Sequence, residues 1–310
     1  MPSVTLLGPQ RRRPIVKSVL DHHGIEGKLA VITGGWEERE DELDDLDDHV
    51  HRPTLNLRLH HRLQDVLSDD VPFAQAVVDR SDRLRMAQTF YRRRLRSALE
   101  SVRALHHMAV PRMGLLLAER SDALRAVADL DDHYLTQIRG IHQAFVDLWD
   151  PTERPGVARV REQVTQELEG CEAILVAGGH VGALLDQLTL LALRPLLPHH
   201  PVIAWSGGAM VMTQQIVLFH DSPPQGQSDP EVYDDGLGLA PNVVALPHAS
   251  ARLNLDDERR VAIFSRRFSP AACVALEEGC GIHWDGARWT PLGGAQRLAE
   301  DGRVVDVVAP

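Results

Sequence analysis

Short runs of apolar residues recur along the chain and predict buried strands. The clearest runs are Val4–Leu7, Leu29–Ile32, Ala173–Val176 and Val202–Trp205. Segments with helical periodicity alternate with them, among them 157–168 and 184–193. Strands that alternate with helices pair mostly in parallel, and the helices then cover both faces of the sheet. The pattern therefore predicts an α/β fold with a mostly parallel sheet flanked by helices.

Weaker runs predict further strands and loops around this framework. We expect strands at 54–59, 216–219, 242–246 and Ala272–Leu276, and short strands near Trp289 and Val304. Residues 221–235 are rich in Pro, Gly, Ser and Asp, which is typical of a loop. The acidic run 37–48 favours a solvated helix start, whose carboxylates suit the helix dipole. A cation site or the mouth of a pocket is the alternative interpretation of that run.

Between residues 65 and 149 the hydrophobic period changes to three- and four-residue steps. The two stripes are Leu84, Ala87, Tyr91, Leu95, Ala98, Val102 and Leu105, and then Leu124, Val127, Tyr134, Ile138, Ile141, Phe145 and Leu148. Pro111 and Gly114 interrupt the pattern between the stripes. We predict a long helical hairpin, inserted over 62–150 into a single α/β domain of residues 1–310. Its stripes could pack on each other, pair with a second copy of the chain, or cover an active site.

Ser206 lies where the run Val202–Trp205 meets a predicted helix with almost no loop between them. Its neighbours Ala204, Gly207, Gly208 and Ala209 are all small. A sharp, strained strand-to-helix turn requires small neighbours, and it aims the first helical N–H groups at whatever binds beside the serine. The stretch predicts a nucleophile elbow. An ordinary glycine-rich strand–helix junction is the alternative.

Composition narrows the functional classes. The chain has 310 residues, 44% of them hydrophobic, and no apolar run reaches the roughly 20 residues that span a bilayer. We therefore expect a cytoplasmic protein without membrane association. A net charge of -11 argues against nucleic acid as a partner, because phosphate binding needs a cationic face. Three scattered cysteines are too few for a disulfide framework or a thiolate metal site.

A serine becomes a nucleophile only when a base takes its proton and donors receive the oxyanion. His248 directly follows a predicted strand and is the candidate base. The N–H groups of Gly179 and Gly207 could form the oxyanion hole. The candidates for the acid that orients the histidine are Glu278, Glu277 and Asp221.

Four segments in this order resemble the cyanophycinase and dipeptidase E group of serine peptidases. They are AILVAGG, PVIAWSGGAM, DDGLGLAPNVVALPHASARL and CVALEEGCGI, which together lie within about 157–295. The resemblance implies a class I glutamine-amidotransferase-like fold, a flavodoxin-like three-layer arrangement. It also implies a triad of Ser206, His248 and Glu278, with Arg252 and His180 as substrate-binding residues. No cofactor and no metal are implied.

The chain departs from the group near the expected substrate site. Ser-Gly-Gly-Ala replaces Ser-Ala-Gly-Ala at the turn, and this change keeps the residues small. His180 and Val181 stand where the group has Asn or Asp and then Gln, and Leu246 and Pro247 replace polar residues before the histidine. The resemblance therefore implies the chemistry of the group but not cyanophycin as the substrate.

The leading hypothesis is a serine peptidase or amidase that acts on a small peptide-like or amide substrate, with a homodimer as the assembly. The first alternative is a non-catalytic binding or scaffold protein on the same fold, which dimerises through the helical insertion. A metal-dependent hydrolase is the second alternative, prompted by 16 histidines. Adjacent pairs such as His60 and His61 rarely bind one metal, and no His-x-x-x-His spacing supports that reading.

Overall fold

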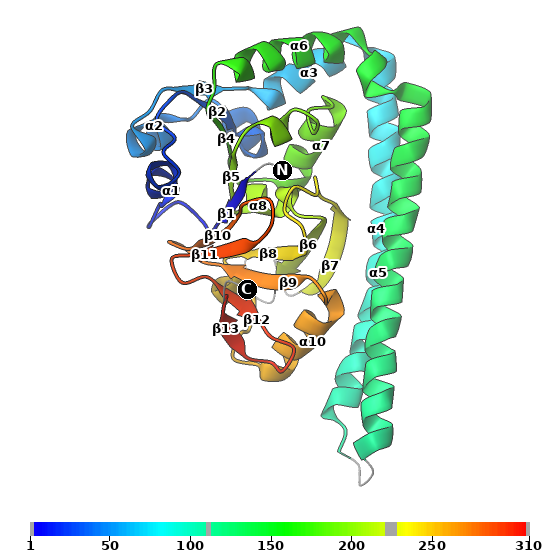
Figure 1. Ribbon diagram of the computed structural model, residues 1–310. Coiled ribbons are helices and arrows are strands. Elements are labelled where there is room, and N and C mark those ends of the chain that lie inside the picture. Colours follow the sequence, from blue (N-terminus) through cyan, green and yellow to red (C-terminus); the bar gives the residue numbers. More distant parts are fainter. Residues whose placement is uncertain (1–2, 110–112, 221–227, 308–310) are drawn as a thin grey trace.

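The computed structural model describes residues 3–109, 113–220 and 228–307. At its centre lies a seven-stranded sheet in the order β11-β10-β1-β5-β4-β2-β3 (Figure 1). Its parallel strands are β1 (Val4–Leu7), β2 (Leu29–Ile32), β3 (Thr54–Asn56), β4 (Ala173–Val176) and β5 (Val202–Trp205). The antiparallel strands β10 (Gly281–Trp284) and β11 (Trp289–Leu292) complete one edge. The predicted α/β fold with a mostly parallel sheet is confirmed.

Helices cover both faces of this sheet, and its central strands β1, β2, β4 and β5 are buried throughout. Successive side chains of a strand point to opposite faces, so each strand contributes to two layers. Leu7 and Leu29 pack with α1 (Val16–His22) and α2 (Asp44–Val50). Leu6 and Ala30 belong to the larger core on the other face. That core includes residues of α3 (Leu59–Asp69), α6 (Pro155–Glu169), α7 (Val181–Leu190) and α8 (Gly207–Met212).

The later strands form two smaller sheets beside the central one. One is four-stranded, in the order β13-β12-β9-β8. Its strands are β8 (Val243–Pro247), β9 (Ala272–Leu276), β12 (Gln296–Leu298) and β13 (Val304–Asp306). The other pairs β6 (Gln215–His220) with β7 (Ser228–Asp235). The remaining short helices are η1 (Gly34–Arg39), η2 (Pro151–Glu153), η3 (Leu197–His199), α9 (Ala249–Arg252) and α10 (Glu258–Phe268).

Two long helices, α4 (Val71–His107) and α5 (Met113–Trp149), pack antiparallel along one side of the molecule (Figure 1). We call this pair the hairpin. The Asp70 carboxylate accepts the N–H of Phe73 and caps the start of α4. Tyr91 and Tyr134 stack across the pair with ring centroids 4.2 Å apart. The far end of the hairpin extends beyond the sheets (Figure 1).

A buried polar network fastens the middle of the hairpin to the rest of the fold. Arg267 of α10 binds Asp131 of α5 through Nε at 2.7 Å and Nη2 at 2.7 Å. The hydroxyl of Tyr91 also donates to Asp131 at 2.7 Å. Because Arg267 and Asp131 are both buried, the pairing removes the large cost of an isolated charge in the interior.

β7 lies along the hairpin, and each of its carboxylates meets a basic side chain there. The pairs are Asp229 with Arg103, Glu231 with Arg92, Asp234 with His142 and Asp235 with Arg139. The Tyr134 hydroxyl adds a hydrogen bond of 3.0 Å to the carbonyl of Tyr233. The strand is therefore held by side chains from both hairpin helices.

Several local expectations were wrong. Residues 228–235 form β7 although we expected a loop over 221–235, because the hairpin supplies partners for its acidic side chains. The third strand ends at Asn56, and Arg58 adopts a left-handed conformation before Leu59 begins α3. Leu148 is 79% exposed rather than part of the buried stripe, since Trp149 beside it packs on the core instead.

Within the described residues, no helix is both long and apolar enough to cross a membrane. Over the same part of the chain, no cluster of three or more His, Cys, Asp or Glu side chains could hold a metal ion. Part of the acidic run is helical, and Asp44, Asp45 and Asp47 occupy the first turn of α2, where the dipole favours negative charge.

Candidate active site

Ser206 occupies the turn between β5 and α8 with a backbone conformation of φ 53° and ψ −122°. A non-glycine residue in such a region costs roughly 1–3 kcal/mol, so the surrounding structure must enforce it. The preceding strand is fully buried, and the Ser206 N–H donates to the carbonyl of Leu7 at 3.1 Å. The turn thus leaves Ser206 half-buried at the carboxyl end of the sheet.

The glycines around Ser206 are there because no larger residue fits. A methyl group added at Gly178 would lie 2.8 Å from Cβ and 3.1 Å from Oγ of Ser206. One added at Gly208 would lie 2.5 Å from the carbonyl oxygen of Val176. The Gly-Gly segment after β4 therefore packs directly against the serine.

The backbones of Gly179 and Gly207 lie close together beside this turn. A methyl group at Gly207 would lie 3.3 Å from the nitrogen and 2.9 Å from the oxygen of Gly179. Gly179 has φ 116°, a conformation that side chains disfavour, and His180 N–H binds the Gly35 carbonyl at 2.7 Å. Neither glycine N–H donates a hydrogen bond to another described residue. An oxyanion hole formed by these two N–H groups stays a prediction.

His248 lies between β8 and α9 in a left-handed conformation, φ 57° and ψ 36°. Its N–H donates to the carbonyl of Leu276 at 3.1 Å, so its position depends on β9. Burial and then the charge of Arg252 lower the pKa of His248, while Glu277 and Glu278 oppose this shift. The imidazole is therefore neutral near pH 7.

The two candidate glutamates follow β9 and approach the serine turn through β1. A methyl group at Gly8 would lie 1.8 Å from the Glu277 carbonyl oxygen, and Gly8 N–H donates to the carbonyl of Cys280 at 3.0 Å. Gly8 directly follows Leu7, which binds Ser206. The turn that carries the serine and the loop that carries the glutamates thus meet at the end of β1.

The described residues of the expected triad are not joined to one another by hydrogen bonds. Among the described residues, Ser206 Oγ forms no hydrogen bond with His248, and neither glutamate side chain forms one with that imidazole. Asp221, the other candidate acid, lies outside the described residues. Catalytic hydrogen bonds are often long in unliganded enzymes and shorten when substrate binds.

Arg252 lies one helical turn after His248 and is half-buried. Its guanidinium carbon is 5.9 Å from the centre of the Phe219 ring, and burial lowers its pKa. It forms no ion pair within 3–109, 113–220 or 228–307. The arginine therefore has a guanidinium edge available for an anionic group.

His180 is exposed at the start of α7, beside Gly179. Its Nδ1 accepts the N–H of Ala183 at 2.9 Å, so the neutral ring carries its proton on Nε2. The sequence reading missed Tyr233, whose hydroxyl would be 2.4 Å from a methyl group at Gly182. That hydroxyl is therefore near His180. The sequence did not indicate Tyr233 as a site residue because it lies in a segment that we expected to be a loop.

Two cavities, of about 200 and 170 Å³, lie away from Ser206. The first is between α1 and β11, and the second is between the hairpin and α10. Gly179 and His180 are exposed beside the serine, so the candidate site is accessible to solvent on this side.

The model of peptidase family S51 matches residues 125–291, which is more than half of the chain. The crystal structure of a peptidase from an acI-B1 Actinobacterium is similar with a TM-score of 0.47 and 13% identity, over 99% of this chain and 97% of that chain. The crystal structure of a putative Peptidase E protein from Listeria monocytogenes EGD-e is similar with a TM-score of 0.45 and 12% identity, over 96% of this chain and 100% of that chain.

No curated protein sequence matches the chain significantly. The family match spans the Gly178-Gly179 segment, Ser206, His248, Arg252 and both glutamates. It confirms the resemblance to the cyanophycinase and dipeptidase E group. The chain belongs to peptidase family S51.

Proposed function

We propose that this protein is a serine peptidase or amidase that cleaves a small peptide-like substrate at Ser206. The observation that carries the proposal is the strained turn at Ser206, with φ 53° and the N–H groups of Gly179 and Gly207 beside it. Strain of this kind persists only where the structure enforces it, and it exposes the hydroxyl next to preorganised donors. Membership of a peptidase family supports the same chemistry.

The proposed reaction begins when Ser206 Oγ attacks the substrate carbonyl carbon and its proton passes to neutral His248. The N–H groups of Gly179 and Gly207 stabilise the resulting oxyanion. His248 then returns the proton to the departing amine, and an acyl ester remains on Ser206. Water hydrolyses that ester by the same steps, with His248 again acting first as base and then as acid.

We assign Glu278 to orient His248 and Arg252 to bind a substrate carboxylate. Glu278 has no side-chain hydrogen bond among the residues the structure describes, whereas one oxygen of Glu277 is already occupied. Glu277 and Asp221 are the alternative acids. A guanidinium suits a carboxylate because it donates two parallel hydrogen bonds. His180, exposed beside Gly179, is the second substrate-binding residue of the proposal.

A scaffold function is the second candidate, and two observations favour it. Ser206 and His248 share no hydrogen bond here, and α4 exposes the large apolar side chains Val78, Met86 and Phe90 at helical spacing. Such a stripe suits a second copy of the chain. In the scaffold function, the hairpin joins two protomers and Ser206 is not a catalytic nucleophile.

Labelling with a fluorophosphonate probe separates the two functions. Wild type should label covalently and Ser206→Ala should not, whereas Ser101→Ala, an exposed serine of α4, should label like wild type. Absence of labelling in folded wild type would contradict the hydrolase proposal. Labelling that persists in Ser206→Ala would contradict Ser206 as the nucleophile.

A further inference from the structure

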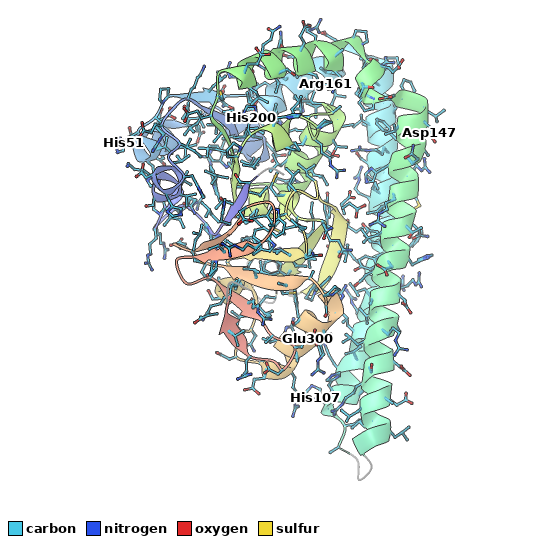
Figure 2. The ribbon with its side chains drawn as sticks, in the orientation of Figure 1. His51, His107, Asp147, Arg161, His200 and Glu300 are labelled. Carbon is cyan, nitrogen blue, oxygen red and sulfur yellow. The ribbon has the colours of Figure 1, made fainter. Side chains whose placement is uncertain are left out.

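The cavity of about 170 Å³ between the hairpin and α10 has the character of a second binding site. Its lining includes Arg103, His106 and His107 from α4 and Arg259, Ile263 and Phe264 from α10. Figure 2 shows His107 near the projecting end of the hairpin, on the side that faces α10. A ligand held here would contact two elements that are more than 100 residues apart in sequence.

The cavity is basic although the whole chain has a net charge of -11. Arg259 contacts the ring of His107 through Nη1 at 3.2 Å and has no carboxylate partner among the described residues. Arg120 is close to the cavity, and its guanidinium donates to the carbonyls of Leu105, His106 and Met108 rather than to an acid. These two positive charges are therefore not neutralised locally by an ion pair.

The acidic groups nearby already have partners. Asp257 Oδ1 accepts the backbone N–H groups of Arg259 and Arg260 at the start of α10. Asp229 pairs with Arg103, and Asp131 pairs with Arg267. Burial lowers the pKa of His106, and the charges of Arg120 and Arg266 lower it further. His106 therefore adds no charge at neutral pH, and the positive potential of the site comes from the excess of arginines over the single Asp257 carboxylate of the lining.

We propose that this cavity binds a small molecule with a phosphate group, whose apolar part lies against Leu99, Ile263 and Phe264. The lining holds Arg103, Arg259 and Arg260 against one carboxylate, that of Asp257, so a group with two negative charges gains more here than a carboxylate with one. A phosphate monoester carries a charge of about −1.5 to −2 and three acceptor oxygens. Guanidinium groups bind such oxygens in pairs, and the buried ring of Phe264 suits an apolar or aromatic substituent.

Calorimetric titration with phenyl phosphate tests the proposal on the full chain. We expect saturable binding with one site per chain, and at least about tenfold weaker binding to Arg259→Ala and to His107→Gln. Arg259 is exposed, so its removal should leave the fold intact. Arg94→Ala is the matched control, because Arg94 lies nine positions before Arg103, about 180° around α4.

Three outcomes would overturn the proposal. The first is no saturable binding of phenyl phosphate to wild type up to on the order of 10 mM. The second is equal affinity in wild type and Arg259→Ala. The third is equal affinity for phenyl phosphate and phenylacetate, which would remove phosphate as the recognised group. Binding by Ser206→Ala should match wild type, and loss of binding there would assign the ligand to the candidate active site.

Discussion

Glu277 and Ser250 are joined by a hydrogen bond of 2.6 Å, in which the backbone N–H of Ser250 donates to Oε1 of the glutamate. Ser250 is two residues after His248, so the bond ties the segment that follows the histidine to the end of β9. The two adjacent glutamates therefore differ in structural role. Glu277 positions the backbone beyond His248, while neither carboxylate oxygen of Glu278 has a hydrogen-bond partner within the described part of the chain.

The first prediction concerns these two carboxylates. Glu278→Gln should lower kcat by roughly four orders of magnitude, because the imidazole loses the group that holds its tautomer and stabilises its positive form. Glu277→Gln should retain most of the activity and lose stability instead, since an amide oxygen is a weaker acceptor for Ser250. Activity assays and urea unfolding of both variants check this assignment. The reverse pattern would make Glu277 the acid of the triad.

The second prediction concerns Arg252. Arg252→Lys should lower kcat/KM roughly 10- to 100-fold for substrates that carry a free carboxylate, because an ammonium cannot make the two parallel hydrogen bonds of a guanidinium. Neutral ester substrates should be affected much less. Steady-state kinetics on a matched pair of substrates measure the difference. Equal losses on both would give Arg252 a structural role, through its contact with Phe219.

The third prediction is a pH profile. Because burial lowers the pKa of His248, kcat/KM should reach half of its plateau below pH 6.5, the ordinary value for histidine. Activity should fall as the pH decreases through this pKa, since the protonated imidazole cannot accept the serine proton. Measuring kcat/KM of the wild type between pH 4 and 8 locates this fall in activity, which is the acidic limb of the profile.

Two charge variants test the cause of this shift. Arg11 lowers the pKa of His248, so Arg11→Gln should move the acidic limb to higher pH. Glu277 raises that pKa, so Glu277→Gln should move the limb to lower pH. Shifts in the same direction would mean that another group controls the limb.

The fourth prediction concerns the network that fastens the hairpin. Asp131→Ala should reduce the free energy of unfolding by about 3–5 kcal/mol, because it leaves the buried guanidinium of Arg267 without its counter-charge. The neighbouring Asp132 is exposed, and Asp132→Ala should change that free energy by less than about 0.5 kcal/mol. Urea unfolding monitors both variants. Similar stabilities for the two would show that the Arg267 pair contributes little.

The parts of the fold that were predictable depend on local signals. Four consecutive apolar residues are enough to indicate β2, β4 and β5, and β1 differs only by Thr5. Small residues around Ser206 are enough to indicate a sharp turn. The hairpin was predictable because apolar residues at helical spacing mark the side of each helix that faces the core. Each of these signals is contained in fewer than 40 residues.

The parts that were not predictable depend on partners distant in sequence. The sequence of β7 is typical of a loop because Ser228–Asp235 is acidic and contains Pro230. Its counter-charges come from residues that are separated from it by between 92 and 139 positions in the sequence. Nothing around Arg267 indicates that it is buried, since its partner Asp131 is 136 positions away. For the same reason the separation of β8 and β9 from the main sheet could not be foreseen, because an apolar run does not specify its neighbour.

The pairing of β7 with the hairpin also limits how the chain could be shortened. A version engineered without residues 71–149 would leave Asp229, Glu231, Asp234 and Asp235 side by side with no cations opposite them. Their mutual repulsion would pull apart the strand that connects the segment carrying Ser206 with the segment carrying His248. A shortened chain would therefore require neutral residues at these positions, and β7 and the hairpin would have to be exchanged together when chimeras are built with relatives.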